Sequence, residues 1–375
     1  MPTRLQPLFL VVDAGGTKTA AAIAGADGTV FGEGVAGGAN MAELGLETAV
    51  TEILRAVNAA VLATTGAAKD TASASVGSAA PYACPLEFQA AWIGASGCDS
   101  DLDVERLTAR LAPAFRNGVT VMNDALLLSV LLRLRSQKQE SRAPAPEAAS
   151  ASGVNVNVDG NGSGSSTGTP WLAAVVAGTG SIVLGIDGQA GQFGKRGGHG
   201  YLFGDVGSAY HLGLVAIRMA ADDYDEGTEV PGGLAALLRK RFGVDSTADV
   251  PARCHDVPPD MDPVSASNER KLRIAALSPA VLSLSGTCPL AARVVREVAR
   301  GLATDIASIA RAAQKWGHSA ARGGLAITGG LGVQPLYVAA VVAELAELGV
   351  RFEWVESVEA PARQCAVALG QCHTV

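Results

Sequence analysis

The sequence predicts an α/β protein, and three observations lead to that prediction. The chain has 375 residues, which fits two domains at about 150 residues per domain. Hydrophobic residues make up 48% of it but aromatic residues only 5%, so Ala, Val, Leu and Gly must build the core, as in proteins whose helices pack closely on sheets. A succession of apolar strand, Gly/Thr turn, apolar strand and polar hairpin begins near residue 8 and recurs near residue 171. The second half therefore repeats the start of the first.

The first half of the chain alternates short apolar runs with helical patterns. The first run ends at Asp13 and is followed by Gly15 and Gly16, which is typical of a buried strand that leads into a tight turn. Strands are predicted over Leu8–Val12, Thr19–Ala24, Thr29–Gly32, Ser73–Ser78, Ala90–Ala95 and Gly118–Met122. Apolar residues at helical spacing from Leu46 to Val61 predict a helix on this sheet. Helices are also predicted over Val104–Leu111 and Ala125–Arg135.

A polar stretch separates the two halves. From Ser136 to Pro170 the residues are mainly Ser, Gly, Asn, Ala and Pro, which cannot bury enough apolar surface to offset the chain entropy lost on folding. We therefore divide the chain into an N-terminal domain over residues 1–135, a flexible surface insertion over 136–170 and a C-terminal domain over 171–375. The insertion is expected to carry no chemistry.

The second half again mixes strands with helices. Strands are predicted over Trp171–Ala177, Ile182–Ile186, Leu325–Thr328 and Phe352–Val355. Helices are predicted over Asp205–Ala221, Ala291–Trp316, Pro335–Leu348 and Pro361–Gln371. The last helix, within residues 361–372, begins with Pro, as helices often do, and can pack back on the N-terminal domain.

Charge and hydropathy exclude several classes of partner. The formal net charge is −7, the isoelectric point is near 5.3, and the short basic run Arg239–Arg241 fits the charged end of a helix better than a nucleic-acid footprint. The most apolar stretch, Trp171–Ile186, is interrupted by polar residues and is shorter than the roughly 18 residues of a membrane span. Met1–Leu10 is too short for a secretory signal. The six cysteines form no CxxC pair, so we expect reduced thiols in a cytoplasmic protein without a zinc site.

Two glycine-rich turns are candidates for anion binding. Asp13–Thr19 and Gly178–Ser181 each follow an apolar strand and place Thr or Ser beside glycine. Glycine allows backbone N–H groups to approach an anion closely, hydroxyl groups add donors, and Asp13 could hold hydrated Mg²⁺. Each turn alone is a weak signal, because most Gly-Thr turns of this kind are only hairpins. Neither matches a P-loop, and the first strand is not followed by a GxGxxG segment that opens a helix.

The order of the motifs is more specific than any one of them. The segment Asp13–Thr17 is followed by a strand that ends at Asn123 and Asp124, then by Ala177–Ser181 and then by Thr328–Gly330. This set resembles the nucleotide-binding framework of the actin, heat-shock chaperone and sugar-kinase superfamily. The segment from residue 197 to residue 210 (GGHGYLFGDVGSAY) is similar to the signature of N-acetylglucosamine kinases and related BadF/BadG-type ATPases. The resemblance implies two actin-like (ribonuclease H-like) domains with an interdomain cleft.

The resemblance also implies ATP and Mg²⁺ as cofactors and assigns residues to them. The first turn corresponds to the loop for the β- and γ-phosphates and Mg²⁺, with Asp13 toward the metal and Lys18 either at a phosphate or facing solvent. The implied nucleotide-site residues are Asp13, Gly15, Gly16, Thr17, Lys18, Gly178, Thr179, Gly180, Ser181, Gly329 and Gly330. Within this set, the last two glycines correspond to the adenosine site.

For the acceptor, the resemblance places the catalytic base at Asp124. The implied sugar-site residues are Asn40, Ser96, Asn123, Asp124, Gly198, His199 and Asp205. Two departures concern recognition of the N-acetyl group: vertebrate kinases of this kind have Trp where His199 stands, and the acidic residue that usually follows the position of Asp205 is Val206 here.

Several of these residues also have a structural explanation. Asn40 with Glu43 would form a helix N-cap and capping box, and both roles can hold at once. Asp124 and Asp205 would each be an N-cap of the helix predicted after it. Ser96 fits a turn serine, and the glycines that flank His199 favour a loop donor to sugar hydroxyls over a core residue.

The resulting hypothesis is transfer of the ATP γ-phosphoryl group to an amino sugar, most simply N-acetyl-D-glucosamine to its 6-phosphate. One alternative is an ATPase that activates a dehydratase, which needs cysteines to hold an iron–sulfur cluster, whereas the cysteines here are scattered. Another is a sugar-responsive regulator, which needs a DNA-binding extension, and only Met1–Leu8 precede the first strand's apolar run. We expect a homodimer with no nucleic-acid or membrane partner.

Overall fold

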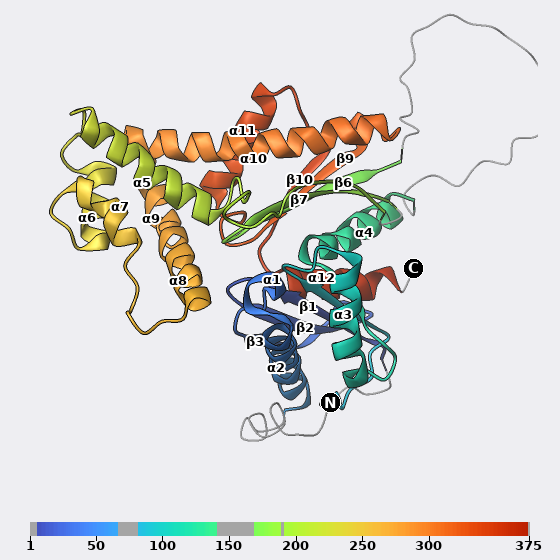
Figure 1. Cartoon of the computed structure of the whole chain (residues 1–375). Helices are drawn as coiled ribbons and strands as arrows, with labels where there is room; N and C mark the ends of the chain where they lie inside the picture. Colours follow the sequence, from blue (N-terminus) through green and yellow to red (C-terminus); the bar gives the residue numbers. More distant parts are fainter. Residues whose placement is uncertain (1–5, 67–81, 141–168, 189–190, 374–375) are drawn as a thin grey trace, which may run out of the picture.

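The computed structural model describes residues 6–66, 82–140, 169–188 and 191–373. Two five-stranded mixed sheets form two lobes, with strand orders β3-β2-β1-β4-β5 and β10-β9-β6-β7-β8 (Figure 1). In each sheet the first three strands in sequence form an antiparallel meander, and the first of them pairs in parallel with a later strand. The predicted α/β class is confirmed, and the repeated sequence pattern corresponds to this repeated topology.

The first sheet has a fully buried centre. Its strands are β1 (Leu8–Ala14), β2 (Thr19–Gly25), β3 (Val30–Ala36), β4 (Ala90–Ala95) and β5 (Thr120–Asn123). Its helices are α1 (Met41–Leu44), α2 (Leu46–Thr65) and α3 (Asp101–Leu111), the last capped by Ser100. Helix α2 crosses β3 closely, because a Cβ at Gly34 would lie 2.2 Å from the Ala56 carbonyl oxygen. A larger residue there would force the helix away from the sheet.

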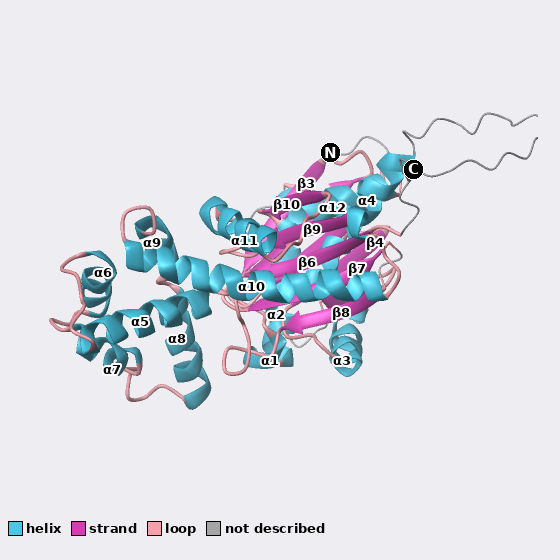
Figure 2. Ribbon diagram, turned by 90° about the horizontal axis from the view of Figure 1, so that it is seen from above, coloured by secondary structure: helices cyan, strands magenta, loops and turns pink. Residues whose placement is uncertain are grey.

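The second sheet has the same plan with longer helices. Its strands are β6 (Trp171–Ala177), β7 (Ser181–Asp187), β8 (Gln192–Gly197), β9 (Gly323–Thr328) and β10 (Trp354–Val358). Helix α10 (Pro289–Lys315) lies along this sheet and α11 (Pro335–Glu347) packs beside it (Figure 2). Buried apolar residues of α10 recur at helical spacing from Ala291 to Ala313.

A group of helices projects from the second lobe (Figures 1 and 2). It consists of α5 (Ala209–Asp225), α6 (Gly233–Phe242), α7 (Val250–Cys254), α8 (Pro263–Ala275) and α9 (Ser278–Leu284). The sequence analysis predicted only part of this region. The basic run Arg239–Arg241 does end a helix, α6, as expected. The helix predicted to begin at Asp205 begins instead at Ala209, with Ser208 as its N-cap.

The lobes share a third hydrophobic core. It contains α4 (Ser129–Glu140), α12 (Pro361–Cys372) and the 3₁₀ turn Asp124–Leu128, packed between inner-face residues of both sheets. Helix α12 lies against the first lobe, where a Cβ at Gly370 would meet the Gly25 carbonyl oxygen at 2.4 Å. Arg135 of α4 stacks over the Trp354 ring at 4.2 Å and pairs with Glu356 at 2.6 Å.

Other boundaries also differ from the prediction. Because α4 continues to Glu140, the helical structure extends beyond the predicted end of the first domain, and the insertion begins later than residue 136. The last strand is shifted to Trp354–Val358 from the predicted Phe352–Val355. Strand β8 was not predicted, because Gln192–Gly197 has no apolar alternation and is held by its pairing with β7. The predicted strand Ser73–Ser78 and most of the insertion lie outside the described residues.

Candidate active site

The first glycine turn lies where β1 ends. The Gly15 N–H donates to the Lys18 carbonyl at 3.0 Å, which closes the turn, and the side chains of Thr17 and Lys18 are exposed. A Cβ at Gly16 would find its nearest neighbour, Asn40, only at 4.0 Å, so one side of the turn is open. The turn therefore offers backbone N–H groups and a hydroxyl to open space, as an anion site requires.

The second and third turns meet the first one. The Thr17 and Thr179 hydroxyl oxygens lie 2.9 Å apart, although the two residues come from different lobes. Gly329 has a φ of +93°, and a Cβ there would lie 2.6 Å from the carbonyl oxygen of Ala177. Only glycine fits this position, because the third turn lies directly against Gly178. The three turns predicted to bind nucleotide thus lie together.

Two carboxyl groups lie beside these turns. Asp13 is the last residue but one of β1, and Asp124 follows β5, two strands away in the same sheet. Burial raises the pKa of Asp13 to about 6, against a smaller lowering by Lys18. Burial and the nearby charge of Asp13 raise the pKa of Asp124 to about 7. Asp13 pairs with Gly94 of β4, and a Cβ at Gly94 would lie 3.0 Å from the Asp124 Cα, so Gly94 lies between the two residues in the sheet. Both side chains offer carboxylate oxygens, which suit Mg²⁺.

The N-cap role predicted for Asp124 belongs instead to its neighbour Asn123. The Ala125 N–H donates both to the Asn123 side chain at 3.0 Å and to the Asp124 carboxylate at 2.9 Å. Asn123 is the N-cap of the turn, and its amide donates to Asp99 at 2.8 Å. Capping therefore occupies Asn123 and one oxygen of Asp124.

Asn40 and Ser96 lie together at the carboxyl edge of the first sheet. Asn40 caps α1, with its side chain accepting from the N–H groups of Ala42 and Glu43. The Ser96 carbonyl accepts from Met41, and the Ser96 N–H donates to Ala14 beside the first turn. The predicted N-cap role of Asn40 is confirmed. The Glu43 carboxylate does not complete a capping box and pairs instead with Lys271 of α8.

Asp205 supports the second turn and does not cap a helix. It has a φ of +58°, is 6% exposed, and accepts from the Ser181 N–H at 3.1 Å. Burial raises its pKa, against lowering by the Ser181 hydrogen bond and Lys271. A non-glycine residue in this backbone conformation carries strain, which is typical of functional sites. A Cβ at Gly180 would lie 2.9 Å from this carboxylate, so Asp205 lies directly behind the turn.

The loop from Gly198 to Gly207 carries the other predicted sugar residues. Gly198 and Gly200 both have positive φ, and His199 between them is exposed. The Tyr201 hydroxyl bonds to Ser267 of α8. Lys195, just before the loop, pairs with Asp99 of the first lobe at 3.5 Å.

Sequence reasoning missed four of the residues around the site: Asp99, Lys195, Tyr201 and Lys271. Tyr201 falls inside the signature segment and could have been found there. The others sit in no motif, because their proximity arises from the packing of α8 and β8 against the first lobe.

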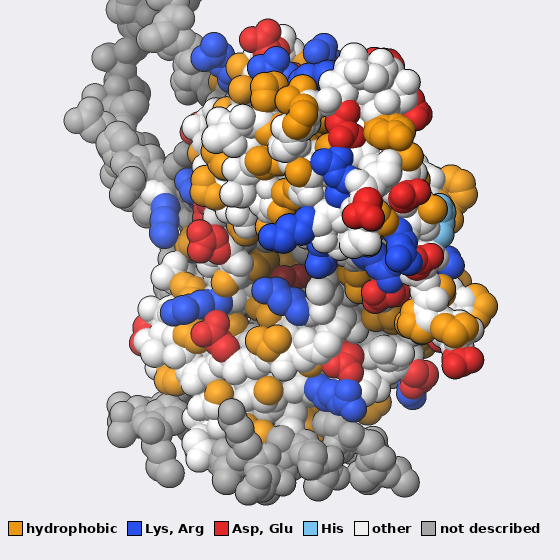
Figure 3. Space-filling view, turned by 90° about the vertical axis from the view of Figure 1, so that its left-hand side faces the viewer, with side chains coloured by type: hydrophobic (Ala, Val, Ile, Leu, Met, Phe, Trp, Pro, Cys, Tyr) orange, Lys and Arg blue, Asp and Glu red, His pale blue; other side chains and the backbone are white. Residues whose placement is uncertain are grey.

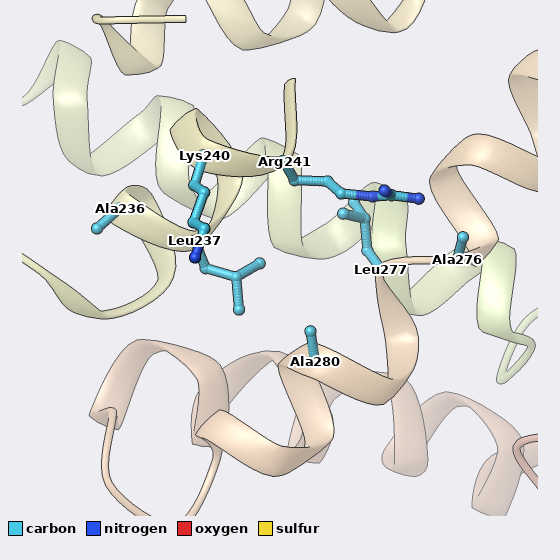
Figure 4. A pocket seen from close by; sticks show the side chains of 7 residues that line it. All are labelled: Ala236, Leu237, Lys240, Arg241, Ala276, Leu277 and Ala280. Carbon is cyan, nitrogen blue, oxygen red and sulfur yellow. The ribbon is translucent and has the colours of Figure 1, made fainter. Parts of the chain in front are cut away.

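The predicted site is separate from the pocket shown in Figure 4. That pocket has a volume of about 610 Å³ and lies in the projecting helices, lined by Ala236, Leu237, Lys240, Arg241, Ala276, Leu277 and Ala280. It contains none of the residues predicted for nucleotide or sugar. The hollow between the lobes is visible in Figure 3, with charged side chains around it.

Within the described residues, no three or more His, Cys, Asp or Glu side chains are arranged to hold a metal. None of the described helices is by itself long and apolar enough to cross a membrane. The segments Pro263–Leu284 and Pro289–Lys315 reach that length and apolarity only together, with a bend of 119° between them.

The fold resembles that of several solved structures. A provisionally named N-acetylglucosamine kinase from Chromobacterium violaceum is 22% identical, with a TM-score of 0.56 and coverage of 98% of this chain and 99% of that one. A provisionally named N-acetylglucosamine kinase from Porphyromonas gingivalis is 17% identical, with a TM-score of 0.59 and coverage of 97% and 98%. A comparison with curated protein sequences finds no match. At these identities the likeness concerns the fold.

The two sheets with their repeated topology give the chain an actin-like fold, as the sequence predicted. The family model for the BadF/BadG/BcrA/BcrD ATPase family matches residues 10–370. The chain therefore belongs to the BadF/BadG/BcrA/BcrD ATPase family.

Proposed function

We propose that this protein is an ATP-dependent kinase for an amino sugar, with N-acetyl-D-glucosamine as the first candidate and the 6-hydroxyl as the acceptor. The observation that carries the proposal is the meeting of Thr17 and Thr179 across the lobes beside the Asp13 and Asp124 carboxyl groups. Such an arrangement can hold a triphosphate on one side and orient an acceptor hydroxyl on the other. The two provisionally named N-acetylglucosamine kinases support the choice of sugar.

The chain's own residues fit ATP and Mg²⁺. Gly16 and Gly330 have open space where a Cβ would lie, with nothing closer than 4 Å, so a phosphate or adenosine could approach their backbone. Thr17 and Thr179 supply hydroxyl donors, and Asp13 would hold the hydrated metal. Bound Mg²⁺ would neutralise charge on the phosphates. The glycine turns would spread the negative charge that develops during transfer over their N–H groups.

Asp124 would act as the general base. One of its oxygens accepts from the Ala125 N–H at 2.9 Å, and no other residue within the described chain donates a hydrogen bond to this carboxylate. The second oxygen would orient the sugar hydroxyl and accept its proton. A pKa near 7 suits this role, because a base is most effective when its pKa lies near the working pH. Asn40, Ser96, Asn123, Gly198, His199 and Asp205 would surround the sugar and provide the many polar partners that a polyol needs.

The dehydratase-activator alternative receives less support. It requires cysteines that can reach a cluster shared between two subunits. Four of the six cysteines are buried in this fold, and burial raises the pKa of Cys98 and Cys365, which makes thiolate formation harder.

The test is ADP release coupled to a panel of hexoses and amino sugars, with unmodified protein, Asp124→Asn and Asp27→Asn. Asp27 lies in an exposed hairpin away from the site, so its variant serves as the matched control. We expect Asp124→Asn to lower the rate of sugar phosphorylation by about 10²- to 10⁴-fold. Near-normal phosphorylation by Asp124→Asn would contradict the assignment of the base. Phosphorylation of 6-deoxy-N-acetylglucosamine would contradict the acceptor position.

A further inference from the structure

Helix α8 belongs to the second lobe but makes its most buried polar contact with the first. In Figure 1 it descends from the projecting helices toward α1 and β3. It is held tightly against α5, because a Cβ at Gly213 would lie 2.1 Å from the Ile274 carbonyl oxygen. From this position Lys271 forms an ion pair with Glu43 of α1. The side chain of Lys271 is only 5% exposed, and that of Glu43 is 26% exposed.

The burial of Lys271 ties this ion pair to the closed arrangement of the lobes. Removing an ammonium group from water is costly unless an opposite charge compensates for it; within the described residues Glu43 is the ion-pair partner, and Asp205 is a further nearby carboxylate. Because α8 and α1 belong to different lobes, separating the lobes would separate the pair. The ion pair therefore forms only when the two lobes are together.

Both ends of the pair are connected to predicted sugar-binding residues. Glu43 is on α1, whose N-cap is Asn40. Lys271 and Glu43 both act on the carboxylate of Asp205, one lowering and the other raising its pKa. One turn before Lys271, Ser267 bonds to the hydroxyl of Tyr201 in the loop that carries His199.

A second and weaker ion pair also joins a lysine of the second lobe to a carboxylate of the first. Lys195 of the second lobe lies 3.5 Å from Asp99 of the first, with both side chains about one-third exposed, at 28% and 33%. An exposed pair at this distance contributes little to stability. Asp99 nevertheless accepts from Asn123, so this contact also leads to the predicted sugar site. Lysine from the second lobe meets carboxylate from the first in both cases.

We propose that Lys271 and Glu43 form an interlobe latch that couples closure of the lobes to sugar binding, with Lys271 as a positioning residue for Asn40 and Asp205. The inference rests on the proposed function, because it takes the substrate to be a sugar bound between the lobes. Loss of the latch leaves the reacting groups intact. It lowers the fraction of molecules that are closed and ready to bind, and the apparent affinity for sugar falls in proportion to that fraction.

Steady-state kinetics of three variants provide the first test. Lys271→Met and Glu43→Gln are each expected to raise the KM for sugar about tenfold or more, with kcat changed by less than about threefold. The double variant should be no worse than the more severe single one, because either change already breaks the pair. The charge-swapped double variant, Glu43→Lys with Lys271→Glu, should recover part of the lost affinity. Arg218→Met is the matched control, since it breaks an exposed pair with Glu297 inside the second lobe.

Small-angle X-ray scattering provides a second test that needs no turnover. Without ligand, Lys271→Met should have a larger radius of gyration than the unmodified protein, and sugar should restore compactness only at higher concentration. Circular dichroism checks that the variants fold. If Lys271→Met does not fold, the scattering comparison is made with Glu43→Gln, which changes a partly exposed side chain. The latch would be overturned if the effects of the two single changes on KM simply added in the double variant. It would also be overturned if the variants left both KM and the scattering curve unchanged. If the unmodified protein phosphorylates no sugar, the proposed function is wrong, and the ligand-free scattering comparison still decides the latch.

Discussion

Replacing Asp124 by Asn should stabilise the protein while it removes activity. The folded-state pKa of Asp124 is about 7, against an ordinary value of 3.8. One pKa unit corresponds to 1.36 kcal/mol, so holding this carboxylate ionised at pH 8 costs the folded state up to about 4 kcal/mol. The side chain is partly exposed and part of the effect comes from the charge of Asp13, so we expect a gain of roughly 2–4 kcal/mol. The Asn side chain can keep the hydrogen bond from Ala125.

The sign of the pH dependence makes this prediction specific. Because the folded pKa lies above the unfolded one, the folded state binds more protons between about pH 4 and 7, and the free energy of unfolding falls as pH rises through that window. The gain in the free energy of unfolding from Asp124→Asn should therefore be absent below pH 4, grow between pH 4 and 7 and level off above pH 7.

The assay is urea and thermal unfolding from pH 4 to 8, with EDTA and without nucleotide. Asp262→Asn is the control: its exposed carboxylate accepts from Val264 and Ser265, and these bonds hold its pKa below the ordinary value. It should show no gain in stability as pH rises. The reasoning would be refuted if Asp124→Asn were no more stable than the unmodified protein at pH 8. It would also be refuted if the difference in stability between the two proteins were the same at every pH.

Two further outcomes are expected. The pH profile of kcat/KM should fall about tenfold per pH unit below about pH 7, because a protonated Asp124 cannot accept the sugar proton; a profile flat down to pH 5 would contradict the assigned base. Gly329→Ala should weaken ATP binding and lower stability by about 1–3 kcal/mol, because it places a Cβ 2.6 Å from Ala177 at a φ of +93°. Gly330→Ala is its control, having open space at the same turn, and equal effects of the two changes on stability would contradict the steric explanation.

The central strands were predictable because their signal is local. Leu8–Ala14 and Trp171–Ala177 are apolar runs that end at glycine turns, and burial on both faces of a sheet requires such runs. The order of the motifs likewise identified the family, since each motif occupies a few consecutive residues. Strand β8 and helices α7 to α9 lack that local signal, because short or weakly patterned segments are stabilised chiefly by the partners against which they pack.

The sequence alone therefore determined the α/β class, the repeated sheet pattern and the residue types available to bind phosphate. Only the tertiary structure decided which of them meet. Thr17 and Thr179 are 162 positions apart and touch because two sheets face each other, and Asp205 supports a turn rather than a helix because Ser208 takes the cap. Lys271 gave no signal at all, since a lysine in a polar helix is ordinarily solvated. Its burial against Glu43 is a property of how one lobe lies on the other, which depends on all the packing between them.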